Sequence, residues 1–98
     1  NAHVFRLPGI PWATVEAGQA TPLAFDVSAS WTVYGLHWTP THLDFYINGC
    51  RVRRHRNTLW HQPLHAVLDI ELMPDWLGLP DDASLPAHFR IDYFRAWQ

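Results

Sequence analysis

The sequence predicts an all-β protein built as an antiparallel sandwich or barrel. Short runs of alternating or β-branched and aromatic residues recur along the 98-residue chain. Clusters containing Gly, Pro and Asn separate these runs. Nowhere does a 3.6-residue apolar period persist beyond a single turn, so no long helix is expected.

The first third of the chain predicts one strand followed by loop. Residues 1–6, NAHVFR, alternate between two faces and indicate a strand. Residues 7–30 contain several Pro and Gly residues and are expected to be loop, with room for one short strand near 22–27. Residues 31–38, WTVYGLHW, are rich in aromatic and β-branched side chains and predict the next strand.

The middle of the chain predicts a hairpin. Residues 42–48 place their apolar side chains on one face, as a half-buried strand does. Asn48-Gly49 is the strongest short signal for a type I′ turn, since both central residues need a positive φ. The run beginning at Cys50 is then the returning strand, and a polar connection follows over 55–63.

Two further strands are expected at 64–72 and 88–97, separated by a loop punctuated by Pro and Gly. The first of them alternates sharply. One face carries Ala66, Leu68, Ile70 and Leu72, and the other carries His65, Val67, Asp69 and Glu71. We therefore expect a buried apolar face and a polar face that presents an imidazole and two carboxylates.

Composition excludes several classes of protein. The chain is 48% apolar, which supports a packed core, and its formal net charge is −2, which gives no reason to expect a nucleic-acid partner. The basic run at 51–56 is interpreted as a solvated strand edge. No apolar run approaches the roughly 18 residues of a membrane span, so no membrane partner is expected. Cys50 is the only cysteine, and the chain lacks an initiator Met, which favours a processed chain or a fragment.

The six Trp residues are unusually many for a chain of this length, and they are the most informative feature of the composition. In a short chain that also has seven His and nine acidic residues, they fit a carbohydrate groove. Sugars present apolar C–H faces that stack on aromatic rings, and hydroxyl groups that bond to carboxylates, imidazoles and guanidinium groups. For any single Trp a place in the core remains the alternative.

Three sequence blocks resemble glycoside hydrolase family 16. They are YGLHWTPTHLDFYING at 34–49, LDIELMPDW at 68–76 and FRIDYFRAWQ at 89–98. Their order and spacing follow the family, and their details are most similar to its agarase and porphyranase branch. The resemblance implies a concanavalin-like jelly-roll β-sandwich. Residues 1–98 would form the C-terminal part of one such domain, about half of the full fold.

The chain departs from the family at its catalytic signature, E-x-D-x-E or E-x-D-x-x-E on one strand. Its only two Glu residues, Glu16 and Glu71, lie far apart. A retaining mechanism needs two carboxyl groups about 5–5.5 Å apart. Asp69 and Glu71 are close enough in sequence, but they fall in the late block. We therefore expect no catalytic residue here, and the chain alone is predicted to be inactive.

The resemblance implies binding roles instead. The strand at 64–72 corresponds to the concave sheet of the family, so His65, Asp69 and Glu71 are expected to face sugar hydroxyls, with Glu71 the leading candidate. The alternative is that the two carboxylates pair with arginines across the sheet, such as Arg51, Arg53 or Arg90.

Trp76, His3 and Trp60 complete the predicted substrate-binding set. Trp76 suits a platform beside a sugar ring or a plug over the end of the sandwich. His3 matches a His-bearing strand next to the catalytic strand of the family. Trp60, together with His61, is either a rim contact or a loop residue without a binding role.

No cofactor is expected. The seven His residues show no zinc spacing on a plausible helix. Some family members carry Ca²⁺ on the convex side, where Asp92 would correspond to a ligand, but Asp92 can equally accept hydrogen bonds from Arg90 or Arg95.

The size of the chain shapes the functional prediction. A complete jelly roll of this kind needs roughly 230–280 residues, so the chain is expected to associate with the missing half of the domain or with a second copy. The predicted function is a groove-lining segment of a retaining endo-β-glycosidase, acting on a β-galactan such as agarose or porphyran. A non-catalytic carbohydrate-binding module and a truncated product without function are the alternatives. The resemblance implies a secreted or periplasmic protein.

Overall fold

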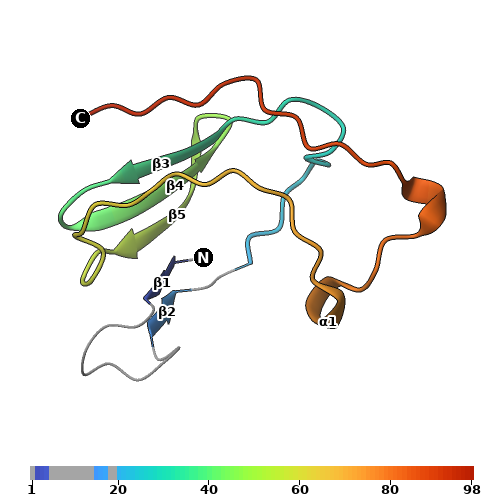
Figure 1. Ribbon diagram of the computed structural model, residues 1–98. Helices are drawn as coiled ribbons and strands as arrows, with labels where there is room; N and C mark the ends of the chain where they lie inside the picture. Colours follow the sequence, from blue (N-terminus) through green and yellow to red (C-terminus); the bar gives the residue numbers. More distant parts are fainter. Residues whose placement is uncertain (1, 5–14, 18–19) are drawn as a thin grey trace. The chain divides into compact units, whose positions relative to one another are not determined.

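The computed structural model describes residues 2–4, 15–17 and 20–98, and it confirms the all-β class (Figure 1). The chain divides into two units, Asn1–Pro63 and Leu64–Gln98. The regular elements, in chain order, are β1 (Ala2–Val4), β2 (Val15–Ala17), β3 (Tyr34–Trp38), β4 (His42–Ile47), β5 (Cys50–Arg56), the helical turn α1 (Pro74–Leu77) and the 3₁₀ turn η1 (Asp82–Ser84).

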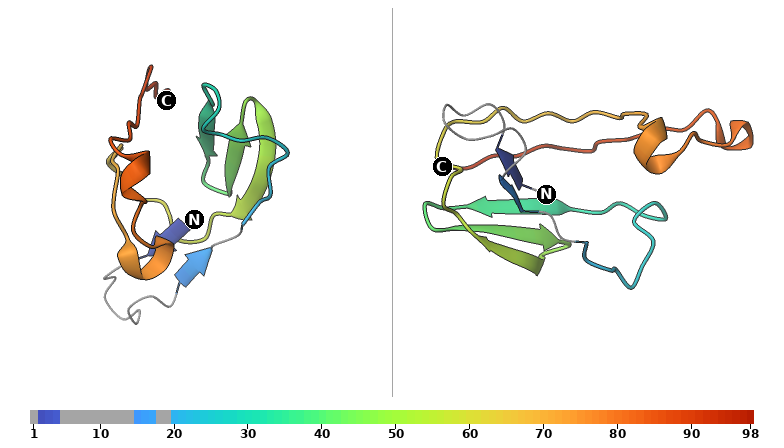
Figure 2. Two further views of the ribbon diagram at one scale, coloured as in Figure 1. Left: turned by 90° about the vertical axis from the view of Figure 1, so that its right-hand side faces the viewer. Right: turned by 90° about the horizontal axis from the view of Figure 1, so that it is seen from below.

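The main feature of the first unit is a three-stranded antiparallel sheet with β4 between β3 and β5 (Figures 1 and 2). The predicted turn joins β4 to β5: Asn48 has a φ of 48° and Gly49 a φ of 78°. Asn48 also ties the turn to the segment before β3. Its side-chain Oδ1 accepts from the Val33 amide at 2.9 Å, and its own amide donates to the Val33 carbonyl at 2.8 Å.

A β-bulge between β4 and β5 changes which side chains share a face. Asp44 pairs with Arg54 and Phe45 with Arg53, but Tyr46 pairs with Arg51, so the register shifts by one residue at this point. Plain alternation would place Arg51 on the face of Arg53. The bulge instead brings Arg51 onto the opposite face, together with Arg54.

The two faces of this sheet therefore differ in character. The side that we call the apolar face carries Tyr34, Leu36, Trp38, Leu43, Phe45 and Ile47, with Arg53 and His55 from β5. The side that we call the Arg face carries His37, His42, Asp44, Tyr46, Arg51, Arg54 and Arg56.

The first third of the chain agrees only in part with its prediction. The strand expected at 1–6 is confirmed for Ala2–Val4, which pairs antiparallel with Val15–Ala17. The second of these strands was not expected, because Pro and Gly dominate the sequence around it. The strand expected near 22–27 is wrong. The carboxylate of Asp26 accepts from the amide and the hydroxyl of Ser28, which forms a local turn and lowers the pKa of Asp26.

The strands expected at 64–72 and 88–97 are also wrong for this chain. Residues 64–98, all of which the structure describes, contain no strand and only the short turns α1 and η1 (Figure 2). Alternation favours an extended backbone, but a strand also requires a neighbour that completes its hydrogen-bond ladder. Among the described residues, no strand pairs with either segment.

The connection after residue 72, expected to be loop, begins with the helical turn α1. Pro74 occupies its first position, where the missing amide costs nothing. The amide of Gly78, at a φ of 78°, donates to the Pro74 carbonyl at 3.0 Å and ends the turn.

Little of this chain is buried. Among the described residues the core consists of Leu43 and Trp60, 4% and 5% exposed, with Phe45 and Leu59 packed against them. Leu68 and Ile70, expected on a buried face, are 52% and 70% exposed. Within the described part of the chain, neither helical turn has the length or apolar character that a membrane span needs.

Candidate functional site

Three of the predicted binding residues lie in the segment between residue 64 and α1. His65, Asp69 and Glu71 are all exposed, and the ribbon here runs without a helical turn (Figure 2). No hydrogen bond or ion pair within the described residues involves the side chains of Asp69 or Glu71. Both carboxylates are thus accessible to a ligand.

Two of the arginines named as possible partners of these carboxylates make contacts within the first unit. Arg51 lies 4.0 Å from Asp44, and Arg53 lies over the ring of Phe45 at 5.6 Å. Arg95 in the C-terminal segment lies 4.7 Å over the ring of Tyr93.

Trp76 is held at the surface by α1. Its backbone amide donates to the Met73 carbonyl at 3.1 Å, while its side chain is 72% exposed. An indole that is so exposed can stack on a sugar ring.

Trp60 occupies a different environment from the one expected of a rim residue. It is 5% exposed, packs in the core with Leu43, and meets His55 edge-on at 5.4 Å between ring centroids. This burial leaves little ring surface for a ligand. His61 beside it is exposed, and the side chain of His3 in β1 lies outside the described residues.

Asn57, a residue that the sequence did not single out, organises the loop around Trp60. Its amide nitrogen donates to the carbonyls of Thr39 and Trp60, each at 2.8 Å, and its oxygen accepts from the Trp60 amide at 2.9 Å. The indole of Trp38 donates to the same Trp60 carbonyl at 2.7 Å. These bonds join the turn after β3 to the loop after β5.

A shallow hollow of about 190 Å³ lies at this junction, lined by Trp38, Thr39, Pro40, Trp60 and His61. Trp38 is 37% exposed, so part of its ring faces solvent. An indole, a Pro ring and an imidazole are suited to the apolar face of a sugar. The Trp38-Thr39-Pro40 triplet could have indicated this hollow from the sequence, because the turn after a strand brings Trp38 and Pro40 together.

The Arg face holds the strongest electrostatic interaction of the described residues. Arg54 grips Asp44 with two parallel hydrogen bonds, Nε to Oδ1 at 2.6 Å and one terminal nitrogen to Oδ2 at 2.7 Å. These hydrogen bonds, with the nearby charges of Arg54 and Arg51, lower the pKa of the Asp44 carboxyl. The same hydrogen bonds, with the negative charge of Asp44, raise the pKa of Arg54.

Metal ligation receives no geometric support in the part of the chain that the structure describes. No group of three or more His, Cys, Asp or Glu side chains is close enough there to hold an ion. Asp92, the residue that the resemblance relates to Ca²⁺, belongs to no such group.

Comparison with known proteins assigns the family. The family model described as "Glycosyl hydrolases family 16" matches residues 12–94, most of the chain. The chain belongs to glycosyl hydrolase family 16. A family 16 origin explains the alternating β-rich sequence, the aromatic excess and the partial sandwich within one framework.

A curated relative supports the assignment to family 16. The beta-glucanase of Acetivibrio thermocellus is 28% identical over 76 residues, which cover 74% of this chain and 22% of the relative. The chain thus spans about a fifth of the length of that protein. No solved structure matches the chain significantly.

Proposed function

We propose that this chain is part of a family 16 glycosidase that acts on a polysaccharide, and that it contributes residues that line the substrate groove. The observation that carries the proposal is the family match over 12–94 in a sequence without the E-x-D-x-x-E signature. The accessible carboxylates and indole at 65–76 support a binding role.

In this proposal the rest of the domain supplies the catalytic groups, and this chain supplies groups that bind the substrate. In a retaining glycosidase one carboxylate attacks the anomeric carbon, and a second carboxyl group about 5–5.5 Å away first donates and then accepts the proton. Those two groups would come from a strand outside these residues. The carboxylates of Asp69 and Glu71 would accept hydrogen bonds from sugar hydroxyls. The imidazole of His65 would donate a hydrogen bond to a hydroxyl or accept one from it, and Trp76 would stack on a sugar face.

A β-galactan of the agarose or porphyran class is the proposed substrate. Its support is the similarity of residues 57–63 and 71–80 to the agarase and porphyranase branch. The curated relative is named a beta-glucanase, so a β-glucan is the competing substrate. Placement of the chain at the C-terminal end of its domain, and secretion or export to the periplasm, belong to the same proposal.

A non-catalytic carbohydrate-binding module is the second candidate function. The observation that favours it is the combination of exposed Trp76 and the Trp38 hollow with the missing catalytic pair. A binding module needs platforms and hydrogen-bonding groups but no nucleophile.

Calorimetric titration of the 98-residue chain with agarose, porphyran and β-glucan oligosaccharides tests the proposal. We expect binding to the galactans, with Glu71→Gln weakening it about tenfold, since a charge-assisted hydrogen bond contributes roughly 1.5–3 kcal/mol. Asp82→Asn, which removes an exposed carboxylate in η1, is the matched control and should bind like the parent. Failure to bind any of the three polysaccharides contradicts the proposal.

The same preparations should release no reducing ends from any of these polysaccharides, because the nucleophile and the acid/base are missing from the sequence. If the pure chain hydrolyses any of these polysaccharides above the buffer blank, the catalytic pair lies within these residues and the proposal is wrong on this point.

A further inference from the structure

Positive charge is concentrated on the three-stranded sheet. Strands β3, β4 and β5 carry four Arg and three His but one carboxylate, Asp44. With neutral His, four Arg against one Asp give these strands a net charge of +3, although the whole chain has a net charge of −2. The acidic residues of the chain are therefore gathered elsewhere.

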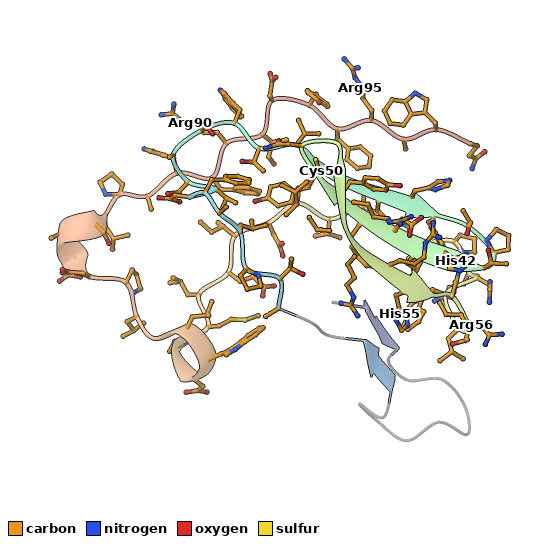
Figure 3. The ribbon with its side chains drawn as sticks, turned by 180° about the vertical axis from the view of Figure 1, so that it is seen from behind. His42, Cys50, His55, Arg56, Arg90 and Arg95 are labelled. Atoms are coloured by element: carbon orange, nitrogen blue, oxygen red, sulfur yellow. The ribbon has the colours of Figure 1, made fainter. Side chains whose placement is uncertain are left out.

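The β-bulge adds Arg51 to the charge on one side of the sheet. Arg51 and Arg54 both reach Asp44, which shows that they share the Arg face. Arg56 pairs in register with His42 on the same face, and Figure 3 shows these two residues at one end of the sheet, with Cys50 at the other end of β5. Arg53, by contrast, lies over Phe45 on the apolar face.

The carboxylate of this face is already engaged. Asp44 has a side-chain exposure of 3%, and both of its oxygens accept hydrogen bonds from Arg54. Arg51 and Arg54 keep about half of their side-chain surface exposed, at 47% and 48%, and Arg56 is exposed as well. The face therefore carries a surplus of accessible guanidinium groups, one of which Asp44 holds in a fixed orientation.

We propose that the Arg face binds the sulfate ester groups of a sulfated polysaccharide. A guanidinium group presents a planar fork of donors that matches the oxygens of an oxyanion, and three of them along one face suit a polymer with repeated negative charges. The inference rests on the proposed function, which supplies the polysaccharide, and it deepens that function by selecting the sulfated, porphyran-like members of the β-galactan class.

The test uses the full chain and its double variant Arg51→Gln/Arg56→Gln. Arg54 is left in place so that Asp44 keeps its partner. The matched control is Arg53→Gln/Arg95→Gln, which removes the same charge from two arginines that lie over aromatic rings, Arg53 on the apolar face and Arg95 in the C-terminal segment. The ligands are porphyran oligosaccharides, their desulfated counterparts and oligogalacturonate, and circular dichroism checks that all three proteins have the same strand content.

We expect the parent and the control to bind porphyran oligosaccharides at least about tenfold more tightly than the desulfated ligand, with a preference that falls as salt rises. The Arg51→Gln/Arg56→Gln variant should lose this preference and bind both ligands alike. Equal weakening by the control variant, or an equal preference for oligogalacturonate, overturns the inference. If the parent binds porphyran and desulfated oligosaccharides equally well, the sulfate inference is wrong but the proposed function stands. If the parent binds none of the ligands, both the inference and the proposed function are wrong.

Discussion

At the scale of single residues, Asp44 shows how this sequence tolerates a charge in its least exposed region. The residue is 2% exposed, and a carboxylate removed from water is strongly destabilising unless it is paired. Arg54 forms a bidentate pair with Asp44 through two hydrogen bonds, and Arg51 adds a second positive charge nearby.

Asp44 should make the folded chain sensitive to acid. Its folded-state pKa lies below the ordinary value of 3.8, because Arg54 stabilises the ionised form. Its contribution to stability is therefore complete above that value and is lost as the pH falls through the folded-state pKa. Thermal unfolding from about pH 5 down to about pH 3 should show a smaller acid-induced loss for Asp44→Asn than for the parent chain.

Asp69→Asn provides the control for this pH experiment, since it removes an exposed carboxylate that has no ion pair among the described residues. This variant should follow the parent curve. An Asp44→Asn curve with the same acid dependence as the parent would mean that the Asp44–Arg54 pair does not contribute to stability.

At the scale of elements, the β4–β5 hairpin is the part of the structure that local sequence determines best. Asn48-Gly49 adopts the positive φ angles that its turn type requires. The bulge that follows is not signalled by the sequence, yet it decides which arginines share a face. A single inserted residue in β5 thus adds Arg51 to the face that already holds Arg54 and Arg56.

Gly49→Ala should destabilise the hairpin by about 1–2 kcal/mol, the cost of a left-handed backbone for a residue with a Cβ. No heavy atom lies within 4 Å of the added methyl group, so backbone strain is the sole cause. Gly35→Ala is the control. It lies in β3 without a positive φ, and its added Cβ would meet the Cβ of Tyr46 at 3.4 Å.

Denaturant unfolding followed by tryptophan fluorescence measures both glycine variants. The lower midpoint should belong to Gly49→Ala. A midpoint equal to that of the parent would show that the turn is not under conformational constraint in solution.

At the scale of the whole molecule, the described part of the chain exposes many more large apolar side chains than it buries. Leu43 and Trp60 are the buried apolar residues of the described part, whereas Leu36, Ile70 and Trp97 are 54%, 70% and 80% exposed. A sheet with one apolar face requires a second layer, and a β-sandwich supplies it with another sheet. A partial family 16 jelly roll has this character.

We expect the isolated chain to associate, either with a second copy or with the missing part of its domain. Sedimentation at micromolar concentrations should show a species larger than a monomer, and Leu36→Arg on the apolar face should weaken the association. Leu79→Arg, at a position 72% exposed outside the sheet, is the control. A compact monomer with the parent sequence would contradict the partial-sandwich interpretation.

The sequence by itself determined the features that depend on neighbouring residues. Asn48-Gly49 specified its own turn, alternation specified the strands around it, and three spaced blocks indicated family 16. These predictions held because φ preferences and side-chain periodicity act within a few residues.

Tertiary structure alone decided the features that depend on partners distant in sequence. Residues 64–72 alternate like a strand but form none, because a ladder needs a neighbouring strand and none pairs with them here. Trp60 lies in the core because Leu43 and Asn57 hold it there, and its sequence context is that of a polar loop. The bulge placed Arg51 beside Asp44, since strand register is set by pairing between strands and alternation along one strand does not reveal it.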